Sequence, residues 1–167
     1  HAREAISEAL GMPASPQPPL EHPVLGETRG VFVTLKSAGR LRGCIGNVES
    51  DRSLRRTVAE MARAAAFHDP RFQPVTGEEF ANVTVEVSVL TPLHRVDDIG
   101  EIKVGLHGLV VDDGVNRGLL LPQVAEEYGW DVDTFLEHTC EKASLPGGAW
   151  KKERTRIYIF SAQVFSE

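Results

Sequence analysis

The segment LRGCIG at residues 41–46 contains the side chains best suited to chemistry. In an extended strand alternate side chains share a face, so Arg42 and Cys44 are expected on one face with Cα atoms about 6 to 7 Å apart. A neighbouring guanidinium favours the thiolate, which is the nucleophilic and metal-binding form of cysteine. Gly43 and Gly46 remove side chains beside the sulfur, so a ligand or another backbone can come close. The pattern predicts a reactive thiol at Cys44, with Arg42, Gly43 and Gly46 as substrate-binding surroundings.

The same six residues also fit a purely structural role. A free cysteine is among the most buried residue types and often packs as a small hydrophobic group. Glycines within a strand can simply mark a bulge, and Arg42 can pair with a surface carboxylate. The residue pattern leaves open whether Cys44 is a nucleophile or a packing residue.

Two further side chains are candidates for moving protons. Glu86 lies in the alternating segment 83–89, on the face opposite its valines. It would be a catalytic acid or base if that face also carries the hexapeptide strand, and otherwise it is a solvated carboxylate. His107, in the segment GLHG at 105–108, would be catalytic if its ring enters a cleft, and otherwise it is an exposed turn histidine.

The end of the helix that precedes Pro70 supplies two candidates for substrate binding. His68 would be a cation near a helix C-terminus, which the helix dipole favours without any chemistry. The sequence Asp69-Pro70-Arg71 is expected to form a rigid turn. That turn either presents Arg71 as an anion clamp or only allows Asp69 to stabilise the turn itself.

No arrangement of cysteine and histidine predicts a metal or cofactor site. The six histidines include no HExxH pair, the two cysteines form no CxxC motif, and residues 105–108 lack the GxGxxG pattern. We therefore expect no zinc, no iron and no other cofactor. Two free thiols, Cys44 and Cys140, are typical of a reducing compartment, so a cytoplasmic location is expected.

Composition describes an ordinary globular protein. With 167 residues, 41% hydrophobic and 25% charged, the chain is expected to form a single domain over residues 1–167. A net charge of −6 argues against a nucleic-acid partner, because neutralising phosphates requires a basic surface. No apolar run approaches the roughly 20 residues that cross a bilayer, so no membrane partner is expected.

Hydrophobic periodicity predicts both helices and strands, without repeated strand–helix–strand units. This mixture favours an α+β fold with an antiparallel sheet flanked by helices. A stiff connector is expected at 13–19, where prolines are frequent. The other expected elements are a helix at 2–10, a hairpin of strands 31–35 and 41–45, a helix from a cap at Ser50 or Asp51 to before Pro70, a strand at 83–89, a hairpin of 108–111 and 118–121, helices at 122–128 and 131–142, and a strand at 157–160.

The hexapeptide at 41–46 matches the signature of the AMMECR family letter for letter, and the chain resembles that family from about residue 28 to residue 160. The resemblance continues through five further blocks. They are HDPRF at 68–72, GLHGL at 105–109, LPQVA at 121–125, GWD at 129–131, and Leu145-Pro146 leading to Trp150.

This resemblance implies a compact α+β fold in which a larger and a smaller subdomain meet at a cleft, with both chain ends in the larger one. It implies partners of the Memo type and radical S-adenosylmethionine (radical SAM) enzymes, as in the AmmeMemoRadiSam system. It names no reaction. Asn47 stands where relatives often carry a hydroxyl residue, so a hydroxyl role at this position is not expected here.

Two functions remain open from the sequence. In the first, the protein is a thiol-dependent enzyme or ligand-binding protein for a small molecule. Cys44 is then the nucleophile, Arg42 supports the thiolate or binds an anionic substrate, and His107 or His68 moves a proton. In the second, it is a noncatalytic adaptor whose glycine-lined groove binds a partner protein or carries a small molecule.

Overall fold

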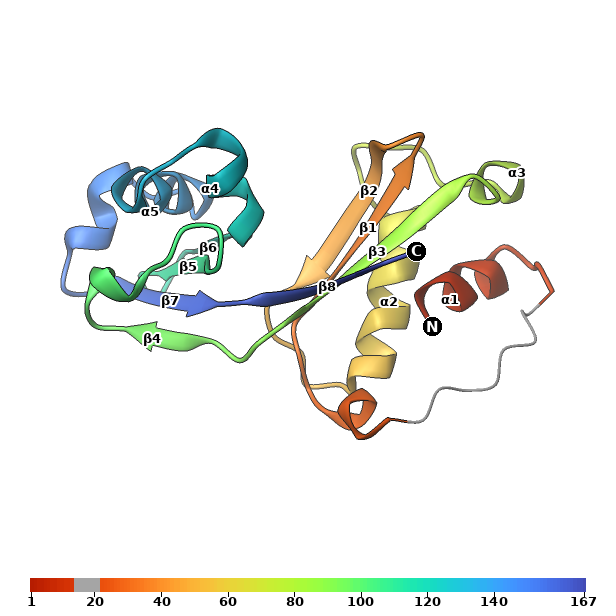
Figure 1. The fold of residues 1–167 in the computed structure, drawn as a ribbon, viewed down its shortest axis with the longest axis horizontal. Coiled ribbons are helices and arrows are strands. Elements are labelled where there is room, and N and C mark those ends of the chain that lie inside the picture. Colours follow the sequence, from red (N-terminus) through yellow and green to blue (C-terminus); the bar gives the residue numbers. More distant parts are fainter. Residues whose placement is uncertain (14–21) are drawn as a thin grey trace. The chain divides into compact units, whose positions relative to one another are not determined.

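The computed structural model describes residues 1–13 and 22–167. It confirms the α+β class: the described residues form two antiparallel four-stranded sheets together with helices (Figure 1). The chain divides into two compact units, His1–Leu90 with Gln163–Glu167 (unit 1) and Thr91–Ala162 (unit 2). The assignment of all residues to one domain stays a prediction. The connector expected at 13–19 falls, apart from Pro13, outside the described residues.

Unit 1 is built on a sheet of strand order β2-β1-β3-β8. Helices α1 and α2 pack together, and α2 lies against β1 and β2 (Figure 1). The core between helices and sheet is formed by apolar side chains such as Ile6, Val33 and Leu35, none of which is exposed. The elements are α1 (Ala2–Ala9), η1 (Pro23–Gly26), β1 (Val31–Ser37), β2 (Arg40–Asn47), α2 (Leu54–Phe67), α3 (Gly77–Phe80), β3 (Val83–Leu90) and β8 (Ala162–Ser166).

The predicted hairpin at the start of unit 1 is confirmed. A two-residue turn joins β1 to β2, with positive φ at both Ala38 (49°) and Gly39 (75°), as the tightest hairpin turns require. The pairing then shifts register, because Leu35 faces Gly43 whereas Lys36 faces Leu41. Arg42 is the extra residue of this β-bulge.

The long helix of unit 1 is also confirmed, but its predicted cap is wrong. The N-cap of α2 is Ser53, whose side chain makes no capping hydrogen bond. Ser50 instead hydrogen-bonds the Thr57 hydroxyl at 2.8 Å and accepts from the Arg52 amide at 3.1 Å, so it orders the loop that precedes the helix. The helix ends at Phe67, before Pro70, as proline restricts the residue that precedes it.

Unit 2 is built on a second sheet, of strand order β4-β7-β5-β6. Helices α4 and α5 are associated with β5 and β6, and Phe135 and Leu136 of α5 are completely buried in the core. The elements are β4 (His94–Val96), η2 (Ile99–Glu101), β5 (Gly108–Asp112), β6 (Arg117–Leu120), α4 (Pro122–Tyr128), α5 (Val132–Lys142), η3 (Gly147–Lys151) and β7 (Arg156–Phe160).

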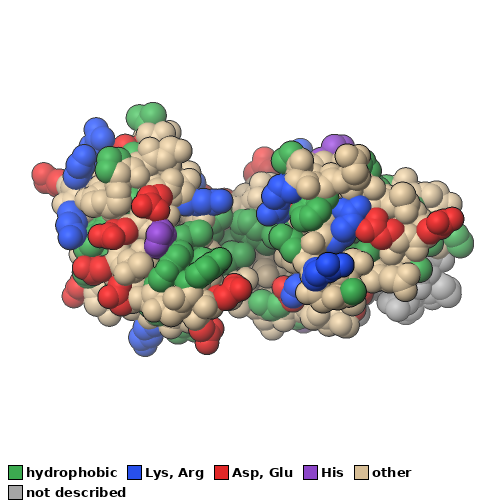
Figure 2. Space-filling model, turned by 90° about the horizontal axis from the view of Figure 1, so that it is seen from above, with side chains coloured by type: hydrophobic (Ala, Val, Ile, Leu, Met, Phe, Trp, Pro, Cys, Tyr) green, Lys and Arg blue, Asp and Glu red, His purple; other side chains and the backbone are tan. Residues whose placement is uncertain are grey.

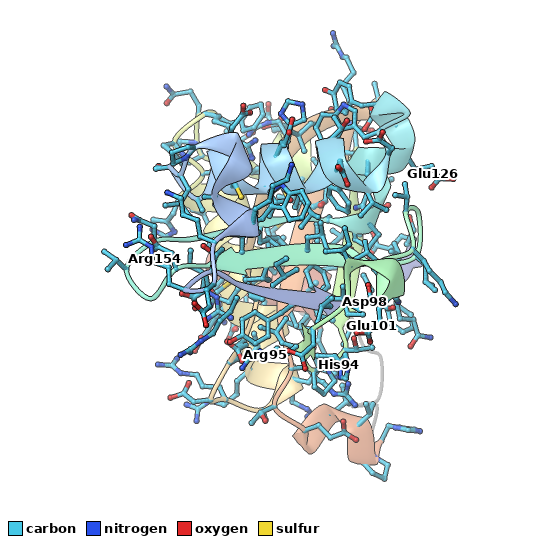
Figure 3. All side chains as sticks on the ribbon, turned by 90° about the vertical axis from the view of Figure 1, so that its left-hand side faces the viewer. His94, Arg95, Asp98, Glu101, Glu126 and Arg154 are labelled. Atoms are coloured by element: carbon cyan, nitrogen blue, oxygen red, sulfur yellow. The ribbon has the colours of Figure 1, made fainter. Side chains whose placement is uncertain are left out.

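Polar side chains order the segment between β4 and β5. Asp98 and Glu101 form a reciprocal capping box around η2. The imidazole Nε2 of His94 lies 3.6 Å from the Glu101 carboxylate. Figure 3 shows these side chains close together at the β4 end of the unit.

Helices of the described residues are all too short or too polar to cross a membrane. Sequence periodicity did not predict β4, β8 or α3, each of which has at most five residues. The predicted strands at 83–89 and 157–160, the hairpin of 108–111 and 118–121, and the helices at 122–128 and 131–142 are confirmed within one or two residues.

Close contact between α2 and β2 makes Gly43 sensitive to substitution. A Cβ atom at Gly43 would lie 2.3 Å from the carbonyl oxygen of Ala65, a backbone atom of the helix. We expect Gly43→Ala to lower the free energy of unfolding by about 3 kcal/mol, measured by urea denaturation, because the helix must shift away from the sheet. The matched control is Gly77→Ala, since nothing lies within 4 Å of that Cβ position. A loss at Gly43 no larger than at Gly77 would contradict this packing explanation.

Candidate functional site

Cys44 belongs to β2, an edge strand of the first sheet, and lies on the sheet face opposite the core residues Val33 and Leu35. It pairs with Thr34 of β1, and the Thr34 hydroxyl donates a hydrogen bond to the Cys44 sulfur at 3.3 Å. The Cys44 amide points away from β1, so the two residues form a non-hydrogen-bonded pair, the kind in which side chains approach most closely. The sulfur is half-buried and has a hydroxyl donor fixed beside it.

The free edge of β2 at Cys44 is occupied by the turn that follows α2. Asp69 Oδ2 accepts a hydrogen bond from the Cys44 amide at 2.9 Å. Arg71 Nη2 donates to the Cys44 carbonyl oxygen at 3.2 Å. Both backbone groups of Cys44 that face away from β1 are therefore satisfied by the turn, as buried or edge polar groups require.

Asp69 and Arg71 form a bidentate ion pair within this turn. Arg71 Nε donates to Asp69 Oδ1 at 2.9 Å and Arg71 Nη2 to Oδ2 at 2.7 Å, while the Arg71 amide adds a bond to Oδ1 at 3.1 Å. The Asp69 side chain is only 2% exposed. The hydrogen bonds from Arg71 hold the pKa of the Asp69 carboxyl far below its usual range, against the opposing effect of burial, and the Cys44 amide adds to this effect. Arg71 thus stabilises the turn, although an additional role in binding an anion stays a prediction.

Arg42, the extra residue of the bulge, forms hydrogen bonds with Glu79 and Gln73 and, among the described contacts, none with the Cys44 sulfur. Its guanidinium donates to the Glu79 carboxylate through Nε and through Nη2, the latter at 2.9 Å, and Nη2 also donates to the Gln73 carbonyl oxygen at 2.8 Å. These bonds hold the pKa of Glu79 below its usual range. Strict alternation does not hold across this extra residue, so the expected placement of Arg42 and Cys44 on one strand face stays a prediction. The remaining nitrogen, Nη1, is buried without a hydrogen-bond partner among the described residues.

Glu86 does lie on the face of the sheet that carries Cys44. It pairs with Thr34 from the other side, so Cys44, Thr34 and Glu86 form a row across three adjacent strands. Two strand spacings, roughly 10 Å, separate Cys44 from Glu86 in this row. The Glu86 carboxylate accepts a hydrogen bond from Lys36 Nζ at 2.9 Å.

Other parts of the protein occupy the space beside the two glycines of the hexapeptide, where a side chain would otherwise lie. Gly43 admits the backbone of α2, and a Cβ at Gly46 would lie 2.3 Å from the ring of Phe32. A strand glycine beside an aromatic ring is a packing solution. In unit 1 these glycines are occupied by Ala65 and Phe32, so the structure does not show them as open space for a ligand.

The two candidate histidines lie in different units. His68 is the C-cap of α2 in unit 1, and its side chain is exposed. His107 belongs to unit 2, where its Nδ1 accepts a hydrogen bond from the Lys103 amide at 3.2 Å. Burial, helped by the nearby Lys103, holds the pKa of His107 below its usual range. Within unit 1, His68 forms no hydrogen bond with the Cys44 sulfur among the described contacts.

Sequence reasoning missed three residues of this arrangement. Thr34 gave no signal, because its role depends on the strand register. Lys36 lies between the two strands predicted for the hairpin, at 31–35 and 41–45, where periodicity assigns it no role. Asp69 was considered as a turn residue, but its bond to the Cys44 amide spans 25 residues of sequence.

A model of the AMMECR1 family matches residues 1–165. The chain belongs to the AMMECR1 family. Its relatives include a protein of Methanothermobacter thermautotrophicus, 47% identical over 173 residues that cover 99% of this chain and 90% of that protein. A protein of Pyrococcus furiosus is 46% identical over 177 residues, with 99% and 84% covered. The crystal structure of an uncharacterized protein from Pyrococcus horikoshii is similar with a TM-score of 0.88 and 44% identity, covering 99% of this chain and 87% of that one. The AMMECR1 fold thus extends over the entire described arrangement around Cys44.

In this AMMECR1-family chain the buried Asp69 should make stability depend on pH. Because its folded pKa is lowered, its contribution is complete above the pKa of an unfolded carboxyl, about 3.9, and is lost as pH falls below that value. We expect Asp69→Asn to lower the free energy of unfolding by about 3 kcal/mol at pH 7, since Arg71 and the strand edge lose a charged partner. The gap between wild type and variant should narrow progressively below about pH 4.

The matched control for this experiment is Asp97→Asn, because Asp97 forms an exposed pair with Arg95. That change should alter the free energy of unfolding by less than about 0.5 kcal/mol at either pH. Denaturant titrations at several pH values provide the measurement. A gap for Asp69→Asn that stays constant from pH 7 to pH 3 would show that its effect is not electrostatic.

Proposed function

We propose that unit 1 carries a thiol-dependent site centred on Cys44, which binds a small polar molecule and uses the sulfur as a nucleophile. The observation that carries this proposal is the hydrogen bond from the Thr34 hydroxyl to the Cys44 sulfur. A hydroxyl donor 3.3 Å from a sulfur stabilises negative charge that develops there during nucleophilic attack. A cysteine that only fills space in a core needs no such donor.

The rigidity of the surrounding backbone supports the same proposal. Asp69 and Arg71 fix the Cys44 amide and carbonyl groups, and α2 packs directly on Gly43. The sulfur therefore has a defined position before any ligand arrives. Preorganisation of this kind lowers the entropy cost of binding and reaction.

The polar side chains near Cys44 on the same sheet face are proposed to bind and orient the ligand. Lys36 and Glu86 offer a cation and a carboxylate, and at roughly 10 Å from Cys44 Glu86 would act on a bound ligand rather than on the sulfur itself. Arg42, which is held by Glu79 and Gln73, stays a candidate for binding through its buried, unpartnered Nη1 donor. His68 and, from unit 2, His107 stay candidates for proton transfer or binding.

The alternative is a noncatalytic adaptor. It is favoured by the pairing of Arg42, Asp69, Arg71 and Glu86 within the protein, which leaves no complete set of catalytic groups around the sulfur among the described residues of unit 1. In either form we propose Memo-type proteins and radical SAM enzymes as partners, as the family resemblance implies. An adaptor would bind a purified Memo-type partner with unchanged affinity after Cys44→Ser.

We also propose a cytoplasmic location. Both cysteines are free thiols, with Cys44 half-buried and Cys140 fully buried. Free thiols of this kind persist in reducing compartments.

Alkylation of Cys44 tests the role of Thr34. We expect Thr34→Val to slow the reaction of Cys44 with iodoacetamide by about two- to tenfold, because the hydroxyl donor is worth roughly 0.5 to 1.5 kcal/mol. Thr34→Ser should keep a rate close to that of the wild type, since it retains the hydroxyl. Rates are followed by mass spectrometry of the peptide that contains Cys44.

Cys140 is the internal control for this measurement. It is completely buried, and burial raises the pKa of its thiol, so it should stay unlabelled while the protein is folded. Equal rates for wild type and Thr34→Val would remove the observation on which the thiol-dependent site rests. A Cys44 that is as unreactive as Cys140 would do the same.

Replacement of Arg42 separates structure from recognition. We expect Arg42→Lys to lower the free energy of unfolding by about 1 to 2 kcal/mol, since lysine loses the two-pronged contact with Glu79 and the bond to the Gln73 carbonyl. Arg95→Lys is the control, because Arg95 is an exposed residue of a surface pair. Thermal melting of both variants decides the matter: an unchanged melting temperature for Arg42→Lys would mean that its guanidinium has no structural role.

A further inference from the structure

Three aromatic rings stack at the turn between α4 and α5 of unit 2. The ring centroids of Tyr128 and Trp130 are 5.1 Å apart with planes inclined by 18°, and those of Trp130 and His138 are 4.1 Å apart at 20°. Trp130 also contacts the buried ring of Phe135, at 6.4 Å. Tyr128 is 67% exposed. The stack is thus anchored in the core of the unit and open to solvent at Tyr128.

Backbone geometry holds the rings in place. Gly129 adopts the left-handed conformation, with φ 65° and ψ 34°, and ends α4. The Trp130 amide donates to the Ala125 carbonyl oxygen at 2.9 Å, and Asp131 caps α5 through the Thr134 amide at 2.9 Å. Because the turn is fixed at both sides, a partner that contacts these rings loses little entropy in ordering them.

The segment that contains α4, α5 and this stack accounts for most of the net negative charge of the protein. Residues 122–142 contain six acidic side chains and one lysine, a net charge of −5, compared with −6 for the entire chain. The acidic residues are Glu126, Glu127, Asp131, Asp133, Glu137 and Glu141.

Within the described residues, these six carboxylates differ from many others in having no Lys or Arg ion-pair partner. Among the described residues, nine carboxylates at other positions form ion pairs with Lys or Arg, of which Glu8–Arg63 and Glu60–Arg52 are examples. Within the described residues no lysine or arginine forms an ion pair with any of the six, and Glu141 is paired only with His138, at 2.8 Å. The charge at this surface is left uncompensated, and like charges four residues apart on α5 repel each other.

We propose that the surface formed by Tyr128, Trp130, His138 and the six surrounding carboxylates (the α4–α5 surface) docks an arginine-rich segment of a partner protein. A guanidinium placed over the exposed Tyr128 ring gains a cation–π interaction, and its neighbours in the segment pair with the carboxylates. Arginine fits better than lysine because its planar group both stacks on rings and binds carboxylates through two bonds. Tyrosine and tryptophan are also the residues that contribute most often to binding energy at interfaces.

Figure 2 views the molecule from the side on which α4 and α5 lie in Figure 1, and shows a hydrophobic patch beside a histidine with acidic side chains around it. The negative charge of the α4–α5 surface also disfavours other binding partners. A second copy of this chain would bring like charges together, and nucleic acids or anionic membranes would be repelled. The surface lies entirely in unit 2 and uses no residue of the Cys44 site, so its test is independent of the proposed function.

The test uses the full chain and a fluorescent synthetic peptide of alternating arginine and glycine, with binding followed by fluorescence anisotropy. We expect Tyr128→Ala to weaken binding by about two- to fivefold, the value of an exposed cation–π contact. Tyr128→Phe should bind as the wild type does, because the ring is retained. Tyr128→Leu should resemble Tyr128→Ala, because an apolar side chain without a ring attracts no guanidinium.

Charge is tested separately. Combined Glu126→Gln, Glu127→Gln and Glu137→Gln changes should weaken binding by about tenfold and reduce its dependence on salt. The matched controls are Phe165→Ala, an aromatic residue 52% exposed in unit 1, and Glu153→Gln, an exposed carboxylate outside the surface. Both should bind as the wild type does, and melting curves confirm that every variant is folded. The proposal would be overturned if all variants bound the peptide with equal affinity, or if the controls lost as much affinity as the surface variants. Equal binding of an acidic peptide, or self-association through this surface in sedimentation, would also overturn it.

Discussion

The buried carboxylate of Asp69 joins the end of α2 and the turn that follows it to the edge of β2, 25 residues earlier in the sequence. It follows directly on the end of α2, accepts the Cys44 amide from the edge of β2, and binds the Arg71 guanidinium that closes back on the Cys44 carbonyl. The Asp69 side chain is only 2% exposed, and its negative charge is stable there because the carboxylate is paired with the Arg71 guanidinium and accepts hydrogen bonds from both neighbouring amides. The position of the thiol and the stability of the unit therefore depend on the same group.

The two glycines of the hexapeptide have a different explanation from the one that the sequence suggested. Gly43 and Gly46 were expected to leave room beside the sulfur, whereas in unit 1 the Ala65 carbonyl and the Phe32 ring occupy those positions. Packing alone accounts for the two glycines. It does not account for the hydroxyl donor on Cys44, so the argument for chemistry rests on Thr34, a residue outside the motif.

Sequence periodicity predicted the elements whose pattern is long and regular, such as β3, where valines alternate with polar residues. It failed where local regularity is broken or where partners come from afar. Alternation predicted Arg42 beside Cys44, but Arg42 is the extra residue of a bulge in β2 and its guanidinium binds Glu79, 37 positions away. The strands β4 and β8 are too short to show a period of two. Candidate residues could be named from their chemistry, whereas their neighbours depend on register and tertiary packing.

The placement of unit 2 between β3 and β8 has a consequence for how unit 1 reaches its native state. Pairing of β3 with β8 closes a loop that contains all of residues 91–162. Within unit 2, however, Thr91 and Ser161 are already joined by two hydrogen bonds, each of 2.9 Å. Once unit 2 has folded, the loop that must close is only a few residues long, which saves about 2.5 kcal/mol of chain entropy. We therefore expect that early folding of unit 2 shortens this loop and so speeds the pairing of β8 with β3 in the sheet of unit 1.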